Sequence, residues 1–257
     1  MQVTRIVKTI TRTQRYKLLI AYDGTAYAGW QVQSNQRTVQ SELEAALRRR
    51  ARVSVKLHGS GRTDQGVHAA GQVAHCDLPF RLAAANLTRA LNALLPADIR
   101  ILRVQPVGAA FHARRSAARK EYRYFIWNGK VISPFLRLYR MHVRAPLDVR
   151  AMRQAAALLV GRHDFTAFTA NPNRKVKSMR RHVMKLTVSR KGPEIVIRAQ
   201  SDGFLYKMVR SLAGFLIRVG EGAVPPEEAL SILHSKIRTA RVPTAPPQGL
   251  FLWRVWY

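Results

Sequence analysis

The segment HGSGRTDQGVHAAGQ, residues 58–72, gathers residue types that can do chemistry in a chain with few acids. Asp64 lies two positions from Arg62 and four from His68, and glycines punctuate the segment on both sides. Glycine lets a backbone turn tightly or approach a ligand closely. A neighbouring arginine keeps an aspartate ionised. The segment therefore predicts a carboxylate that acts as a nucleophile or a base.

Other interpretations of this segment stay open. Asp64 is also the kind of residue that closes an Asx turn in a glycine-rich loop. Ser60, His68 and Asp64 are the side-chain types of a hydrolase triad, although the nucleophile-elbow context is missing. A metal site is a further alternative, although the spacing matches no zinc signature. The side chains that would form it are His58, Asp64, His68, His75 and Cys76.

Expected turns and helix starts explain seven of the fourteen acids. Asp23 and Asp202 precede glycine in expected turns. Five acids lie near the starts of expected helices, where the helix dipole favours them: Glu42, Glu44, Asp148, Glu227 and Glu228. Asp64 differs from these acids because its surroundings are built like a site.

Apolar spacing predicts the elements that position this segment. The residues from Thr38 to Arg50 form an amphipathic pattern, with Thr38 as a cap and arginines at the far end. Further helices are expected over 83–95, 147–161, 204–220 and 225–237. Strands are expected over 18–21, 99–107, 120–128 and 248–257, and a hairpin over 182–200.

Strands and helices interleave in both halves of the chain, and each half carries an Asp-Gly turn. This order predicts an α+β fold with helices packed on a mixed or antiparallel sheet. We expect a basic N-terminal arm over 1–15 and an N-terminal subdomain over 16–115 that carries the Asp64 loop. A C-terminal subdomain over 116–257 would complete the cleft.

The charge of the chain narrows the class of partner. Lys and Arg number 44 against 14 Asp and Glu, a net charge of +30. The electrostatic field of such a charge attracts polyphosphates and favours nucleic acid as the partner. The single cysteine, Cys76, excludes an internal disulfide and a CxxC zinc site. No apolar run reaches membrane-spanning length, so no membrane partner is expected. The acid-free N-terminus leaves organellar import as a minor alternative to a cytoplasmic protein.

The segment GRTDQGVHAAGQV resembles the GRTDAGVHA signature of the TruA family of tRNA pseudouridine synthases. One position departs from that signature, because Gln65 stands where the family usually has alanine. This puts the substrate preference in question. Other blocks resemble the family in its order, and they span nearly the whole chain: YDGTAYAGWQ, TVQSELEAAL, FHARRSAARKEYRY, DGFLYKMVR and APPQGLFL.

The resemblance implies the isomerisation of uridine to pseudouridine with one catalytic aspartate, Asp64, and with no cofactor and no metal. It implies that Arg62 takes part in flipping the target base and that Tyr122 stacks on it. Arg210 would pair with the carboxylate, and Leu250 would line the pocket. From the pattern alone a phosphate contact remains open for Arg62, exposure at the surface for Arg210, and core packing for Tyr122 and Leu250.

The resemblance also implies two similar α/β subdomains that share a continuous sheet, with an RNA-binding cleft between them. The implied substrates are uridines 38, 39 and 40 in the anticodon stem-loop of tRNA, and the implied assembly is a homodimer. Basic residues expected to contact the RNA backbone are Arg114, Arg115, Arg119, Lys120 and Lys207. A non-catalytic RNA-binding or ribosome-assembly protein of the same fold is the alternative function.

Overall fold

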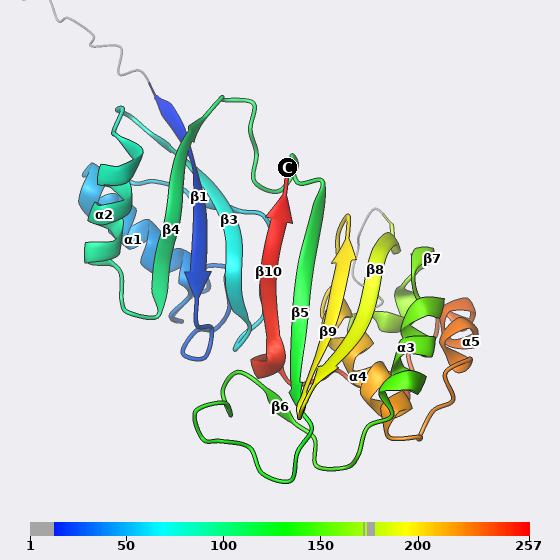
Figure 1. Cartoon of the computed structure of the whole chain (residues 1–257). Coiled ribbons are helices and arrows are strands. Elements are labelled where there is room, and N and C mark those ends of the chain that lie inside the picture. The colour runs from blue at the N-terminus through cyan, green and yellow to red at the C-terminus, as the bar shows by residue number, and fades with distance from the viewer. Residues whose placement is uncertain (1–12, 172, 174–177) are drawn as a thin grey trace, which may run out of the picture.

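A ten-stranded sheet organises the protein (Figure 1). The computed structural model describes residues 13–171, 173 and 178–257. The strand order is β4-β1-β3-β10-β5-β9-β8-β7, with β2 paired to β3 and β6 paired to β5. The strands are β1 (Gln14–Tyr22), β2 (His58–Gly59), β3 (His68–Leu78), β4 (Ile99–Val107), β5 (Arg119–Trp127), β6 (Met141–His142), β7 (Gly161–Asp164), β8 (Arg180–Lys191), β9 (Glu194–Ser201) and β10 (Leu250–Trp256).

The helices form two groups, one toward each end of the sheet in the view of Figure 1. One group packs near β4, β1 and β3, and the other packs near β5, β9 and β8. This arrangement confirms the α+β fold with two subdomains on one sheet. The helices are α1 (Val39–Ala51), α2 (Ala84–Leu94), α3 (Val149–Leu158), α4 (Met208–Gly220) and α5 (Glu228–Ser235), with short 3₁₀ turns η1 (Thr166–Phe168) and η2 (Pro247–Gly249).

The last strand joins the two subdomains. β10 runs parallel to β3, where Phe251 pairs with His68, and antiparallel to β5, where Leu250 pairs with Tyr124. The chain therefore ends in the middle of the sheet. Of the expected basic arm over 1–15, residues 1–12 lie outside the described residues, and β1 already begins at Gln14.

Local sequence explains α1 as expected. Thr38 caps the helix, and its hydroxyl accepts a hydrogen bond from the amide of Ser41 at 3.2 Å. The apolar stripe of α1, which includes Leu43 and Leu47, is buried against the sheet. Burial of this stripe contributes most of the stability of such a helix.

The helix expected over 204–220 begins later than its apolar pattern indicates. α4 begins at Met208, because Lys207 has a left-handed backbone (φ 55°) that breaks the helical path. Residues 204–207 instead form a turn in which the amide of Met208 bonds to the carbonyl of Leu205 at 3.1 Å. This turn faces the cleft described below.

The sequence predicts no strand over 68–78, yet β3 occupies this range. Its alternating pattern is hidden because polar side chains such as His68, Gln72 and His75 are buried along with the apolar ones. Gln72 is satisfied by Ser60, whose hydroxyl lies 2.7 Å from the Gln72 amide oxygen, and by the Gly61 carbonyl at 2.9 Å. β3 therefore has both faces buried near the centre of the sheet.

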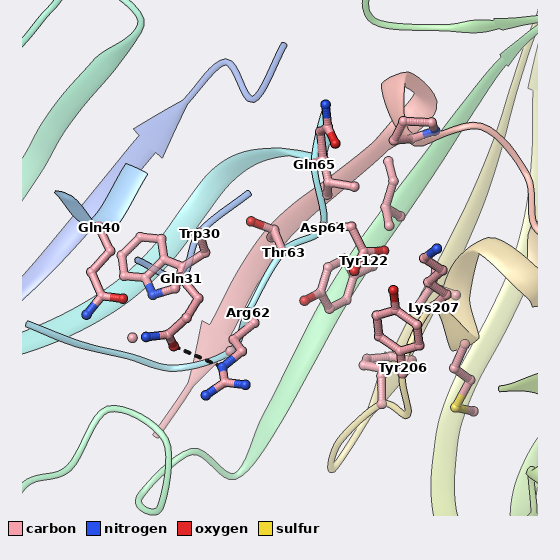
Figure 2. Close-up of a pocket in the computed structure, with 18 of the residues that line it drawn as sticks. Trp30, Gln31, Gln40, Arg62, Thr63, Asp64, Gln65, Tyr122, Tyr206 and Lys207 are labelled. Atoms are coloured by element: carbon pink, nitrogen blue, oxygen red, sulfur yellow. Dashed lines mark hydrogen bonds between the residues drawn. The ribbon is translucent and has the colours of Figure 1, made fainter. Parts of the chain in front are cut away.

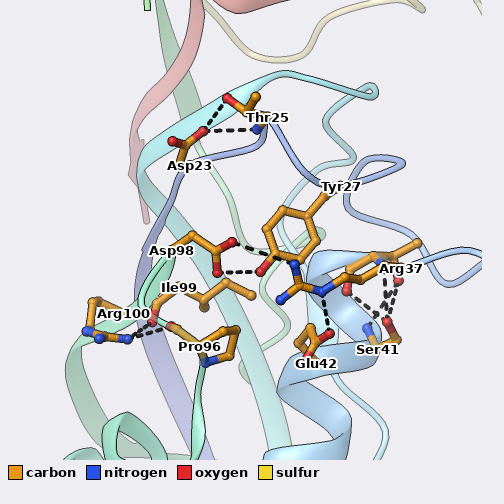
Figure 3. A network of polar contacts seen from close by, with 11 residues as sticks. Asp23, Thr25, Tyr27, Arg37, Ser41, Glu42, Pro96, Asp98, Ile99 and Arg100 are labelled. Atoms are coloured by element: carbon orange, nitrogen blue, oxygen red, sulfur yellow. Dashed lines mark hydrogen bonds and ion pairs between the residues drawn. The ribbon is translucent and has the colours of Figure 1, made fainter. Parts of the chain in front are cut away.

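A polar network fixes the long connection between β1 and α1 (Figure 3). The Tyr27 hydroxyl donates to Asp98 at 2.5 Å, and the Arg37 guanidinium lies 3.8 Å from the other oxygen of Asp98. Arg37 also bonds to Glu42 at 2.8 Å. The connection is thus tied both to the start of β4 and to α1, and this positions the residues that follow Tyr27.

Among the described residues, none of the helices has the length and apolar character of a membrane span.

Candidate active-site cleft

A cleft of about 1390 Å³ lies between the two subdomains. Its lining combines residues from the loops after β1 and before β3 with residues from β5 and from the start of α4 (Figure 2). The five residues to which the resemblance assigns a role in the site all belong to this lining: Arg62, Asp64, Tyr122, Arg210 and Leu250. Of the basic residues expected to contact RNA, Arg114, Lys120 and Lys207 belong to it, whereas Arg115 and Arg119 do not.

The loop that carries Asp64 is fixed from both sides through Thr63. The Tyr22 hydroxyl lies 2.8 Å from the Thr63 hydroxyl, and the Trp30 amide donates to the Thr63 carbonyl at 3.1 Å. Gly29 makes this approach possible, because a Cβ at this position would lie 2.7 Å from the Thr63 carbonyl oxygen and its φ is +103°. The loop is therefore held before any ligand binds.

Asp64 forms an ion pair with Arg210. A terminal nitrogen of Arg210 lies 3.1 Å from Oδ2 of Asp64, and the two side chains are 11% and 25% exposed, respectively. Nε of Arg210 donates to the carbonyl of Ala245 at 2.7 Å, and the Ala245 amide donates to the Arg210 carbonyl at 3.0 Å. The guanidinium is thus held by two partners, and the carboxylate still faces the cleft.

Strand β5 has two tyrosines on one face, and their side chains lie in different surroundings. Tyr122 lines the cleft, whereas the Tyr124 hydroxyl donates to the carbonyl of Pro246 at 2.8 Å. The ring of Tyr122 meets Phe204 edge to face at 5.2 Å. Burial raises the pKa of Tyr122 well above its usual value, and the nearby Tyr22 and Asp64 add to this effect. Tyr122 therefore keeps its proton.

Arg62 points away from Asp64 (Figure 2). Its Nε donates to the side-chain oxygen of Gln31 at 2.9 Å, and the residue is exposed. This hydrogen bond therefore orients the exposed Arg62 side chain within the cleft lining. Leu250 is 5% exposed and contributes apolar surface to the lining. Gln65 is exposed at the rim beside Asp64.

Lys120 is held by the protein, although the sequence suggested an RNA contact. Its ammonium donates to the carbonyl of Ser60 at 2.6 Å, at the start of the loop that carries Asp64. Burial, with a contribution from Arg114, lowers the pKa of Lys120 to about 8. The side chain therefore supports the loop. The alternation that places Tyr122 and Tyr124 on one face also includes Lys120, and this signal could have indicated it.

Cations outnumber acids in the cleft lining. Among the described residues that line it, Lys and Arg number seven and carboxylates number two, Asp64 and Glu44. Glu44 is occupied by structure, because its Oε1 accepts from the Leu57 amide at 2.9 Å and from Gln40 at 2.9 Å. Burial lowers the pKa of Arg181 on the opposite wall. Among the described lining residues, Asp64 is thus the carboxylate that remains available to a ligand in the cleft.

The hydrolase triad does not assemble. The hydroxyl of Ser60 bonds to Gln72 at 2.7 Å, away from any imidazole. Nδ1 of His68 accepts from the Gly24 amide at 3.0 Å, and its Nε2 lies 3.0 Å from the Leu138 carbonyl. Both nitrogens of His68 are therefore occupied by the backbone.

The side chains of the proposed metal site do not come together in the structure. His58 and His75 stack at 5.0 Å with His112 beside them, but Asp64 and His68 have the other partners given above. Nδ1 of His75 accepts from the Ala113 amide at 3.1 Å, and burial together with Arg15 and the other histidines lowers the pKa of His75 to about 4. Among the described residues, no group of three His, Cys, Asp or Glu side chains is arranged to hold a metal ion.

The sequence contains no indication of several residues that line the cleft. Gln31, Arg181 and Tyr206 lie in the lining, and Trp30 forms its floor beside Gly59, where a Cβ would come within 2.7 Å of the indole. Nothing in the spacing of these residues points to a site. Their part in the cleft follows from the approach of segments that are distant in the chain.

Comparison with known proteins identifies relatives over nearly the whole chain. A family model described as tRNA pseudouridine synthase matches residues 18–114 and 155–257. Curated proteins named tRNA pseudouridine synthase A are similar to the chain. The protein from Exiguobacterium is 44% identical over 95% of this chain and 98% of its own length. Those from Bacillus licheniformis and Bacillus subtilis are 45% and 44% identical over 95% of this chain and 99% of their own lengths.

Proposed function

Because the chain belongs to the tRNA pseudouridine synthase family, we propose that it converts uridine to pseudouridine in tRNA with Asp64 as its catalytic carboxylate. One observation carries the assignment of Asp64. Its carboxylate lies in a cleft whose described lining includes seven lysines and arginines, and Arg210 from the other subdomain pairs with it at 3.1 Å. The cations attract the RNA backbone, and we assign the carboxylate among them to the ribose.

The reaction breaks the bond between C1′ of the ribose and N1 of uracil and joins C1′ to C5 of the same base. C5 loses a proton and N1 gains one, so the isomerisation needs no oxidant and no reductant. Asp64 either attacks C1′ or removes a proton from the sugar to open a glycal route. Both routes require a carboxylate that reaches the ribose, and the position of Asp64 in the cleft lining supports this assignment.

The target base must leave its stack to reach this cleft. We assign Tyr122 to the flipped uracil, because its ring lies beside the Asp64 loop and its phenol stays uncharged. We assign Arg62 to the space that the base vacates. In the free protein Gln31 holds this arginine at 2.9 Å, so binding of RNA would exchange one hydrogen bond for another. Leu250 would complete the apolar side of the uracil pocket.

Release of tritium tests the reaction directly. The protein is incubated with tRNA transcripts that carry uridine tritiated at C5, and tritium in water is counted. Wild-type protein should release tritium in proportion to pseudouridine formed, and Asp64→Asn should release none. Tight RNA binding without release from any of several tRNAs would contradict the proposal and favour the non-catalytic RNA-binding alternative.

The resemblance extends the proposal to the substrate and the assembly. We propose that the targets are the anticodon-arm uridines named above, that the protein acts as a homodimer, and that it acts in the cytoplasm. Mapping of pseudouridine in treated tRNA tests the first point. Light scattering of the purified protein, which should give twice the mass of one chain, tests the second. Modification confined to another arm, or a monomer at micromolar concentration, would contradict the corresponding point.

A further inference from the structure

Two histidines hold the basic turn that precedes β5. Nδ1 of His112 accepts hydrogen bonds from the amides of Arg114 and Arg115, at 3.1 and 3.3 Å. Nδ1 of His75 accepts a hydrogen bond from the amide of Ala113 at 3.1 Å. Three consecutive amides of the turn therefore donate to imidazole nitrogens. An imidazole nitrogen accepts only while it carries no proton, so the turn requires both rings in the neutral form with hydrogen on Nε2.

The ring of His112 acts on this turn as a cap. Its Nδ1 is bonded to Cγ, as is the side-chain oxygen of asparagine, and asparagine is a preferred acceptor for amides two and three positions ahead. The backbone closes the same turn. The Ser116 amide donates to the His112 carbonyl at 2.9 Å, and the His112 amide donates to the Ser116 hydroxyl at 3.0 Å. The path of the chain from His112 to Ser116 is thus fixed in the free protein.

This turn presents Arg114 to the cleft. Arg114 is exposed and belongs to the cleft lining, whereas Arg115 does not. None of the ion pairs among the described residues includes Arg114. Its charge contributes to the lowered pKa of Lys120, which lines the same wall. A guanidinium without an acidic partner in such a cleft is available to a phosphate of the RNA.

We propose that His112 is a positioning residue for tRNA binding, because its ring caps the turn and so directs Arg114 to a phosphate. The ring itself makes no contact with RNA in this role. Because the turn is already ordered, the phosphate contact costs less conformational entropy when RNA binds. This inference rests on the proposed function and adds how the cleft holds one of its phosphate contacts in place.

The salt dependence of tRNA binding tests this role. Arg114→Gln should weaken binding roughly 5-fold and reduce the slope of log affinity against log salt by roughly 0.7–0.9, as for the loss of one phosphate contact. His112→Ala should reduce the slope by a similar amount, although it removes no charge at neutral pH. The double variant should bind like Arg114→Gln. His112→Asn should stay within about twofold of wild type in affinity and keep its slope, since the amide oxygen replaces Nδ1.

A histidine elsewhere on the surface provides the matched control. His234 is exposed on α5 and is not part of the described cleft lining, so His234→Ala should keep both the affinity and the slope. Thermal melting should show that all variants are folded. An unchanged slope with His112→Ala would overturn the proposal, as would a loss that multiplies with that of Arg114→Gln. A His112→Asn variant that binds no better than His112→Ala would overturn it too.

The pH dependence of binding is a second readout, and it decides the matter even if His112→Ala does not fold. Partial burial lowers the pKa of His112 below its usual value of 6.5, with contributions from Arg115, His58 and Arg15, and the His75 ring lies 4.7 Å away. The cap is therefore intact at neutral pH and is lost as the pH falls through this lowered pKa.

Wild-type protein should lose affinity for tRNA relative to His112→Asn across the pH range in which NMR shows the His112 ring to titrate. A constant ratio of the two affinities across this range would overturn the proposal. A gain in affinity by wild type would also overturn it, because the protonated ring would then bind phosphate itself.

The two proposals fail in different ways. If wild-type protein releases no tritium from C5-labelled tRNA, the proposed function fails, whatever the His112 variants do. If wild-type protein releases tritium and His112→Ala matches it in affinity and salt slope, the function stands and the positioning role is wrong. When the positioning role holds, His112→Ala raises KM roughly 5-fold and leaves the single-turnover rate at saturating tRNA within about threefold.

Discussion

The guanidinium of Arg210 lies 3.1 Å from the carboxylate of Asp64, although 146 positions separate the two residues in the chain. Asp64 belongs to the loop before β3, and Arg210 to the first turn of α4. The pair thus bridges the two subdomains. Its formation requires that both have folded onto the common sheet, so the catalytic assignment and the tertiary fold can be tested with the same residues.

Replacement of Asp64 by asparagine should remove turnover and keep the fold. Asparagine preserves the size of the side chain and a hydrogen-bond acceptor for Arg210, but it is neither a nucleophile nor a base. We expect a loss of at least about 1000-fold in single-turnover tritium release. Binding of tRNA in a filter assay should stay within about threefold of wild type. Turnover above one hundredth of the wild-type rate would contradict the catalytic role.

Removal of Arg210 should reveal its coupling to Asp64. Arg210→Ala leaves a partly buried carboxylate without its partner and should lower the free energy of unfolding by about 2 kcal/mol. In the Asp64→Asn background the same change should cost about 1 kcal/mol less, because no charge is then left unpaired. Urea unfolding of the four proteins measures this difference. Strictly additive losses would show that the ion pair contributes nothing to stability.

Lysine cannot replace this arginine. Nη1 of Arg210 bonds to Asp64, and its Nε bonds to the carbonyl of Ala245. A single ammonium cannot reproduce both contacts in the same plane. Arg210→Lys should therefore remain folded but lose about 10-fold or more in turnover. Wild-type turnover by this variant would indicate that charge alone suffices at this position.

Lys120 should give the stability of the protein a particular pH dependence. The pKa of Lys120 is lowered to about 8 by burial, from 10.5 for an ordinary lysine. The cost of burying the charge is therefore present in full below pH 8 and disappears as the pH rises to about 10.5. Across this window wild-type protein should gain up to about 3 kcal/mol relative to Lys120→Met. Urea unfolding at several pH values checks this, and parallel curves would contradict the buried charge.

Arg181 should contribute to the salt dependence of tRNA binding. Burial lowers the pKa of its guanidinium, and its Nη1 donates to the carbonyls of Ser178 and Arg180 at 2.9 and 2.6 Å. A phosphate in the cleft would supply the opposite charge. Arg181→Gln should reduce the slope of log affinity against log salt by roughly 0.7–0.9. The control is Arg190→Gln, since Arg190 lies on β8 outside the described cleft lining. An unchanged slope for Arg181→Gln would remove it from the RNA interface.

The sequence predicted the elements whose apolar spacing is regular and missed those whose interior is polar. The helix capped by Thr38 and the strand that carries Tyr122 are present as expected. β3 was not expected, because buried Gln72 and His75 interrupt its alternation and are satisfied by partners elsewhere in the chain. Local patterns carry no information on such partners.

The same limit applies to the cleft. The alternation along β5 places Tyr122 and Tyr124 on one face but does not separate their roles. The separation depends on Pro246, whose carbonyl binds Tyr124 from 122 positions away. The direction of Arg62 depends in the same way on Gln31. The spacing of residues identified the carboxylate loop, whereas the walls of the cleft required the tertiary structure.

The central position of β10 has a consequence for protein synthesis. The ribosome makes this strand after the other nine strands of the sheet, yet it separates β3 from β5 and supplies Leu250 to the cleft. Until β10 inserts, a nascent chain must carry two unpaired strand edges in its centre, where another chain can add by strand pairing. Insertion of β10 therefore completes the cleft lining and covers these two strand edges in the same folding event.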